Sequence, residues 1–137
     1  MRTRFRDLVN GAAVATGTTA EVTFSGGAKT MKQNTTLEAR WVANAAAYGI
    51  IDQGPDPNSG STDMANVSWV CPTIHPELAI APEGTPGHSI LFRDAAATPA
   101  ADATTLLAAT LVAQTAYELF VDRDLLAAAW RDFRGEA

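Results

Sequence analysis

The chain has 137 residues, of which 47% are hydrophobic and 18% charged, and its net charge is −5. These values are typical of a globular domain rather than a disordered chain, and the length fits one domain with a core of its own. The acidic balance excludes a general nucleic-acid surface, which needs clustered Lys and Arg to displace counterions.

Charge distribution, cysteine count and hydropathy add further constraints. Residues 1–40 hold six Lys/Arg against three Asp/Glu, and residues 41–137 hold four against twelve, which suggests two pieces with different surroundings. The single cysteine, Cys71, excludes an internal disulfide framework and suits a reducing cytosol. No apolar run approaches the roughly 20 residues of a membrane span, and no apolar core follows the Arg-rich start. We therefore expect a cytoplasmic protein without a membrane partner.

The first 25 residues predict one helix and one strand. Residues 1–16 have the spacing of an amphipathic helix, and Gly17 stands where a left-handed C′ residue is expected. Residues 20–25 alternate apolar and polar side chains, which is typical of a strand with one solvated face. A lone strand leaves its backbone groups unpaired, so its partners lie further along the chain, on another chain, or in a part that was removed. We favour the last explanation.

A second helix is predicted to begin near residue 35. Thr35 and Glu38 have capping-box spacing, and Gly49 closes the segment. Its apolar stripe is Leu37, Trp41, Val42, Ala45 and Tyr48. Residues 52–62 carry two prolines and two glycines and are predicted to form a loop.

The middle of the chain predicts a short sheet. Residues 67–71 and 78–81 are short apolar runs, typical of strands that are buried on both faces. A loop over residues 82–87 then delivers His88 to the start of another helix. A sheet of this kind needs helices to cover it.

Two C-terminal helices are expected to cover one face of this sheet, which makes the predicted fold class α/β. The first spans about residues 98–120, and Asp122 can cap the second, which reaches residue 133. The side chains predicted to face inward are Leu106, Leu107, Thr110, Leu111, Ala113, Tyr117 and Phe120 in the first helix, and Leu126, Ala129, Trp130 and Phe133 in the second.

Several short motifs resemble a known family. They are Gly60-Ser61-Thr62-Asp63, Asn66-Val67-Ser68, Pro72-Thr73-Ile74-His75-Pro76, Gly87-His88 followed by Phe92, Ala95-Ala96, and a tail that runs through Asp124-Leu125-Leu126 to Asp132-Phe133. As a set they resemble the C-terminal end of the zinc-dependent amidohydrolases and metallopeptidases of the aminoacylase and glutamate-carboxypeptidase family. The branch most similar is that of aminobenzoyl-glutamate hydrolases and β-alanyl-lysine-type dipeptidases. The resemblance covers essentially the whole chain.

The resemblance implies a domain layout. Such enzymes have an α/β/α zinc-exopeptidase-like domain interrupted by an inserted ferredoxin-like domain, which covers the site and often dimerises. On this layout residues 1–28 resemble the last helix and strand of the inserted domain, and residues 29–137 resemble the C-terminal part of the catalytic domain. We therefore expect a homo-oligomer or a partner chain that binds through residues 1–28.

The resemblance also assigns candidate site residues. His88 is the one metal-ligand candidate, in a site that holds two zinc ions in the intact family enzymes. The alternative is a histidine that is merely exposed at the start of a helix. Ser61, Thr62 and Asp63 are site-loop candidates, although a turn that satisfies its own backbone explains them as well. His75 is more typical of a packing or supporting residue than of a ligand, and Cys71 of a core residue.

The implied chemistry is metal-assisted hydrolysis of an amide bond in an N-acyl amino acid or a dipeptide. The family's His-x-Asp motif and Glu-Glu pair, and with them the general base and most ligands, are absent from this sequence. We therefore expect a C-terminal fragment that contains no catalytic residue of its own, is inactive alone and does not retain zinc. The alternative is a non-enzymatic interaction module that docks on a partner chain.

Overall fold

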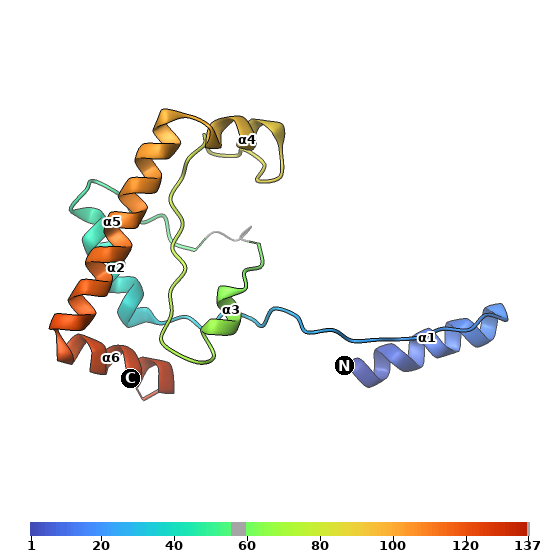
Figure 1. The fold of residues 1–137 in the computed structure, drawn as a ribbon. Helices are drawn as coiled ribbons and strands as arrows, with labels where there is room; N and C mark the ends of the chain where they lie inside the picture. The colour runs from blue at the N-terminus through green and yellow to red at the C-terminus, as the bar shows by residue number, and fades with distance from the viewer. Residues whose placement is uncertain (56–59, 137) are drawn as a thin grey trace.

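The computed structural model describes residues 1–55 and 60–136, and within them the chain forms α-helices and no β-strand (Figure 1). The helices are α1 (Arg2–Thr16), α2 (Thr35–Ala46), α3 (Met64–Val67), α4 (Ile90–Ala96), α5 (Pro99–Val121) and α6 (Arg123–Arg134). The predicted α/β fold is therefore wrong, because the described part of the chain is all-helical. Residues 56–59 of the predicted loop lie outside the described residues.

The segments predicted as strands take other forms. Val67 ends α3, and the Cys71 amide donates to the Val67 carbonyl at 3.2 Å, so residues 67–71 form a helical turn. Residues 20–25 lie along α1, where the Phe24 ring meets the Phe5 ring edge-on at 6.0 Å. Residues 78–81 run along a helix layer without ladder bonds to other described residues. A period-two pattern indicates burial on one side, and a single segment laid on helices satisfies it without a sheet.

The core lies where α2, α5 and α6 pack against one another, with α4 against α5. Trp41 and Ala45 of α2 and the fully buried Leu111 of α5 form its centre. The partly buried residues around this centre are Val42, Ile50, Ile74, Leu78 and Leu107. The core thus joins residues that are about 70 positions apart along the chain.

The helix ends follow local capping rules. Gly17 adopts the left-handed conformation predicted for it (φ 66°) at the end of α1. Thr98 caps α5 and Asp122 caps α6 through side-chain oxygens that accept backbone N–H groups. The start of α2 differs from the predicted capping box of Thr35 and Glu38. The cap is instead Asn34, whose Oδ1 accepts a hydrogen bond from the Leu37 amide.

Helix α5 presents only part of the predicted face to the core, with Leu107 and Leu111 inward as predicted. It buries Ala101, Leu111 and Thr115, whereas Leu106, Tyr117 and Phe120 are exposed, Phe120 by 87%. Apolar residues occur on all sides of α5 itself. Its sequence therefore does not distinguish a buried face from an exposed one. By length and composition α5 could also cross a membrane, although the core helix of a folded domain meets the same criterion.

Helix α6 packs on α2 and α5 instead of on a sheet. Of its predicted stripe, Ala129 is buried, whereas Trp130 is 37% exposed and meets the Phe133 ring edge-on at 5.5 Å. The end of α6 is joined to the segment at the start of α2. Nδ2 of the Asn34 side chain donates to the Ala129 carbonyl at 2.9 Å, and the Lys32 ammonium donates to the Phe133 carbonyl.

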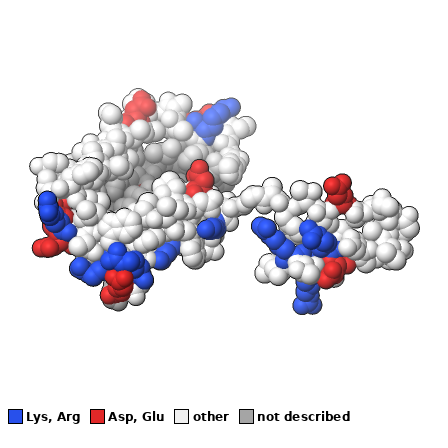
Figure 2. All heavy atoms as spheres, turned by 60° about the horizontal axis from the view of Figure 1, so that its bottom comes forward, with Lys and Arg blue, Asp and Glu red and all other residues white. Residues whose placement is uncertain are grey.

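Helix α1 contacts none of the other described helices and buries no residue. In Figure 1 it lies at one end of the molecule, joined to the remaining helices by the segment after residue 17. That segment is attached to α3, where the Lys29 amide donates to Asn66 Oδ1 and the Trp69 indole donates to the Thr30 carbonyl. Figure 2 shows Lys and Arg side chains gathered on the α1 end, whereas the larger part has a hollowed, mostly uncharged face.

Candidate functional site

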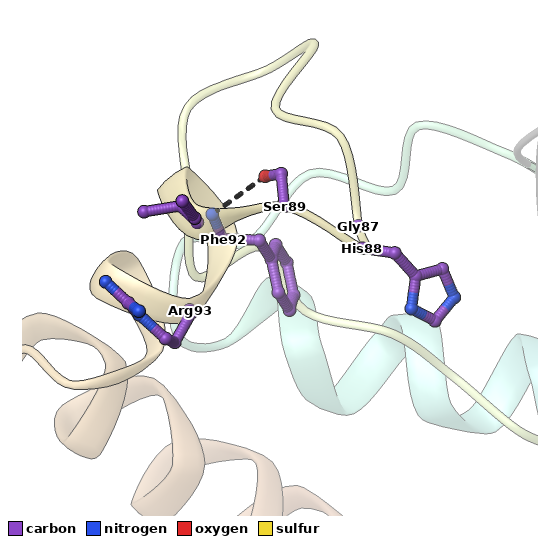
Figure 3. A pocket seen from close by; sticks show the side chains of 6 residues that line it. Gly87, His88, Ser89, Phe92 and Arg93 are labelled. Carbon is purple, nitrogen blue, oxygen red and sulfur yellow. Dashed lines mark hydrogen bonds between the residues drawn. The ribbon is translucent and has the colours of Figure 1, made fainter.

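His88 stands immediately before α4, as the sequence predicts. The Ser89 side chain caps this helix, with Oγ accepting the Phe92 amide at 3.1 Å. His88 is exposed, and its ring points away from α4 while Arg93 lies on the other side of the helix start (Figure 3). Residues around the first turn border a shallow, open hollow of about 480 Å³. Its lining is Gly87, His88, Ser89, Ile90, Phe92 and Arg93.

The polar groups at this hollow are few. Arg93 is held by its neighbour Asp94, with Nη2 2.7 Å from the carboxylate oxygen. Within residues 1–55 and 60–136, no three His, Cys, Asp or Glu side chains come close enough to hold a metal ion together. A catalytic zinc needs about three protein ligands and a water. The donor side chains of the described residues therefore do not fit a zinc site by themselves.

The predicted site loop lies immediately before α3, apart from the hollow at His88. Thr62 Oγ1 accepts the Met64 amide at 3.2 Å, which is the local turn bond considered above for this residue. Asp63 precedes α3 without a capping bond from its side chain, and Ser61 is exposed. None of the three lines the hollow at His88, so the described structure does not bring the predicted site residues together.

His75 and Cys71 lie on the chain that leaves α3. His75 is exposed, between the half-buried Ile74 and Pro76. Cys71 is half-buried rather than a full core residue, and its sulfur lies 3.6 Å from Thr73 Oγ1. Neither residue is close enough to two other metal-binding side chains of the described chain to form a site.

A polar cluster between α2 and α5 is absent from the sequence-based predictions. Arg40 donates from Nε and Nη2 to the two oxygens of Glu118, each at 2.6 Å. Asn44 donates to Glu118 at 2.8 Å and to Thr115 at 3.1 Å, and Gln114 donates to Asn44 at 3.1 Å. The signal was available, because Arg40 and Asn44, and likewise Gln114 and Glu118, are four residues apart on predicted helices.

These contacts shift the pKa values of the carboxylates involved. The hydrogen bond from Arg40, helped by that from Asn44, lowers the pKa of Glu118 below its ordinary value. The backbone amide of Thr36 and the Thr35 hydroxyl likewise lower the pKa of Asp132, which joins α6 to α2. Burial raises the pKa of Glu38. Because Glu118 and Asp132 both link helices, their charge state affects the stability of the fold.

A second hollow, of about 300 Å³, lies where α2, α5 and the chain after α3 meet. Its lining is mostly apolar: Leu37, Trp41, Met64, Pro72, Thr73, Ile74, Pro76, Val112, Thr115, Ala116 and Leu119. No buried side-chain N or O atom in the described residues lacks a hydrogen-bond partner. This hollow thus offers shape and apolar surface rather than catalytic groups.

Comparison with known proteins finds distant relatives of one kind. No family model and no solved structure matches the chain. Among curated proteins, however, the chain is distantly homologous to dipeptidases. The particular relatives are Xaa-Arg dipeptidase of Homo sapiens, 33% identical over 138 residues, and that of Mus musculus, 31% identical over 136 residues.

The extent of these matches matters for interpretation. Each match covers 93% of this chain but only 30% of the human protein and 31% of the mouse protein. The chain therefore spans about a third of the length of the curated relatives it matches. The predicted kinship with dipeptide hydrolases is confirmed at this coarse level, whereas a particular branch and substrate are not determined by it.

Proposed function

We propose that the chain forms the C-terminal part of a metal-dependent hydrolase that cleaves the amide bond of dipeptides or N-acyl amino acids. The observation that carries this proposal is similarity to Xaa-Arg dipeptidase along 93% of the chain. Dipeptides of the Xaa-Arg type are the first substrates to test. Aminobenzoyl-glutamate is the second, because of the motif resemblance at Gly60–Asp63 and Gly87–His88.

His88 is the residue that this chain contributes to the metal. Its exposed imidazole precedes α4 on a backbone held by the Ser89 cap, so the ring can reach a group outside this chain. When bound, the zinc ions of such enzymes supply Lewis acidity and an activated water. The remaining ligands and the general base come from the part of the enzyme that lies outside this sequence. No catalytic step is therefore assigned to residues of this chain.

The remaining proposed roles follow the division at residue 28. Residues 29–137 belong to the catalytic part, with Ser61, Thr62 and Asp63 near its substrate side. Residues 1–28 are the end of an inserted domain and bind a second copy or a partner chain. This binding role is supported by the exposure of Phe5, Leu8 and Val14 on α1, which contacts none of the other described helices. The same exposure favours the second candidate function, a non-enzymatic module that docks on a partner.

A graft tests the metal proposal. The stretch of human Xaa-Arg dipeptidase that matches this chain is replaced by residues 1–137, and hydrolysis of an Xaa-Arg dipeptide and bound zinc are measured. We expect an active graft in which His88→Ala lowers the bound zinc and reduces the activity at least 10- to 100-fold, which is the loss found when a residue that only supports a metal ligand is replaced. His75→Ala is the matched control, because His75 is the other exposed histidine. An inactive graft, or one that is insensitive to His88→Ala, contradicts the proposal.

A further inference from the structure

Gly87 and His88 lead into α4, and both residues are exposed. Neither of them makes a hydrogen bond to any other residue in the ranges 1–55 and 60–136. A Cβ atom added at Gly87 would meet no atom within 4 Å, so packing does not hold the backbone there either. Because glycine can adopt more backbone conformations than other residues, this stretch needs a constraint from outside it to keep His88 in one place.

The Ser89 hydroxyl supplies such a constraint, because it makes one hydrogen bond on each side of His88. It donates to the Pro86 carbonyl at 2.7 Å, and it accepts the Phe92 amide at 3.1 Å (Figure 3). The bond to Pro86 closes a short turn that has Gly87 and His88 between its ends. The freedom of these two residues is therefore limited by a bond that neither of them makes.

The backbone of Ser89 is in turn anchored to the rest of the molecule. Its carbonyl accepts the Arg93 amide at 3.1 Å, so Ser89 belongs to the first turn of α4. Helix α4 packs against α5, which carries the fully buried Leu111. Among the described residues, the place of His88 relative to the core thus depends on the bond from one hydroxyl to the Pro86 carbonyl.

Thr98 makes the same pair of bonds at the start of α5, where there is no candidate site. Its hydroxyl donates to the Ala95 carbonyl at 2.8 Å and accepts the Ala101 amide at 3.2 Å. Ser89 and Thr98 are both half-buried. The turn closed by Thr98 encloses two alanines, whereas the turn closed by Ser89 encloses Gly87 and His88. Thr98 is therefore a matched control, and it also shows that a threonine can make both bonds.

We propose that Ser89 is a positioning residue, which sets the place of the His88 imidazole through the bond from its hydroxyl to the Pro86 carbonyl. The inference deepens the proposed function and rests on it, because the place of His88 matters to hydrolysis only if this side chain takes part. The bond from Phe92 stabilises the start of α4, whereas the bond to Pro86 orders the residues before it. Substitutions can separate the two bonds.

The first measurement is made on the full 137-residue chain without metal, as amide order parameters from nitrogen-15 relaxation. We expect Gly87 and His88 to be rigid in the unmodified chain, with values of about 0.85, and to fall below about 0.6 in Ser89→Ala. Ser89→Thr should restore the rigid values, because threonine carries the same donor and acceptor. Thr98→Ala removes an equivalent pair of bonds and should leave both residues rigid.

Ser89→Asp separates the bond to Pro86 from the cap of α4. An ionised carboxylate can accept the Phe92 amide but cannot donate to the Pro86 carbonyl. Exchange of the Phe92 amide should therefore change little in Ser89→Asp and accelerate roughly fivefold in Ser89→Ala. The order of Gly87 and His88 should be lost in both variants.

The second measurement is made on the graft into human Xaa-Arg dipeptidase. Ser89→Ala should lower kcat for an Xaa-Arg dipeptide at least tenfold, which is the loss found when a residue that orients a ligand is replaced. KM should stay within about twofold, because the groups that bind the dipeptide are unchanged. Ser89→Thr should restore kcat, and Thr98→Ala should not lower it.

Three results would overturn the proposal. They are unchanged order of Gly87 and His88 in Ser89→Ala, an equal loss of order in Thr98→Ala, and an active, His88-dependent graft whose kcat does not depend on Ser89. An inactive unmodified graft contradicts the proposed function instead. The two failures are distinguishable, because the order of Gly87 and His88 is measured in the chain alone.

Discussion

Arg40 of α2 and Glu118 of α5 form a two-point ion pair, in which Nε and Nη2 each lie 2.6 Å from a carboxylate oxygen. The planar guanidinium and the planar carboxylate share two parallel hydrogen bonds. This geometry fixes the orientation of the two side chains in addition to the attraction between their charges. Asn44 completes the arrangement from the same helix as Arg40. The two helices that carry the core, α2 and α5, are therefore also joined by a polar contact beside it.

Removal of this contact should lower stability more than removal of an exposed ion pair. In Glu118→Gln the bidentate acceptor is lost, and Asn44 keeps a poorer partner. Thermal unfolding followed by circular dichroism should show a lower midpoint. Glu136→Gln is the matched control, because Glu136 also pairs with an arginine, at 2.7 Å, but both side chains are about half exposed. Equal midpoints for the two variants would show that the α2–α5 contact stabilises the fold no more than an exposed ion pair does.

The stability of the chain should fall on acidification. The pKa values of Glu118 and Asp132 are both lowered in the folded state by the hydrogen bonds they accept. Their contribution is present above the ordinary carboxylate pKa of about 4 and is lost as pH falls through the lowered folded values. Glu38, with a pKa raised by burial, acts in the opposite sense.

Urea unfolding between pH 3 and pH 7 measures this dependence. The free energy of unfolding of the unmodified chain should decrease below about pH 5, and Glu118→Gln should make the decrease shallower. Asp132→Asn should have a similar effect, because its carboxylate accepts from Thr35 and Thr36 at 2.9 Å. A slope that neither variant changes would mean that other groups control the acid response.

The buried face of α5 can be tested with two leucines. Leu111 is fully buried against Trp41 and Ala45, so Leu111→Ala should cost about 2–5 kcal/mol of unfolding free energy. Leu106 lies on the same helix with 71% of its surface exposed, and Leu106→Ala should change stability by less than about 0.5 kcal/mol. A reversed order would mean that Leu106, rather than Leu111, lies on the buried face of α5.

The sequence specified helix positions better than helix faces or tertiary partners. Local chemistry ends the helices, and so Gly17, Thr98 and Asp122 mark real boundaries. The inward face of α5 is a tertiary property, decided by how α2 and α6 pack on a helix that is apolar all round. Strand formation is likewise tertiary, because ladder bonds need a second strand that the described residues do not supply.

In the candidate site, too, the sequence predicted local features but not tertiary ones. The position of His88 before a helix followed from the Gly/Pro loop that precedes it, and the structure confirms it. The arrangement of Ser61, Thr62 and Asp63 around a common site could not follow from their spacing, because the structure places them at α3, apart from the His88 hollow. Short motifs determine local turns, whereas the convergence of distant groups depends on tertiary packing.

The isolated chain should neither bind zinc tightly nor hydrolyse dipeptides. One exposed imidazole at His88 is a single ligand, and ligand binding must offset the loss of the hydration shell of the ion, which takes several donors held together. Equilibrium dialysis with zinc should give less than one bound ion per chain at micromolar zinc. Assays on an Xaa-Arg dipeptide and on aminobenzoyl-glutamate should give no turnover above the zinc-only rate. His88→Ala is the control, and it should change neither result. Stoichiometric zinc together with turnover, both lost in His88→Ala, would show that these 137 residues form an enzyme by themselves.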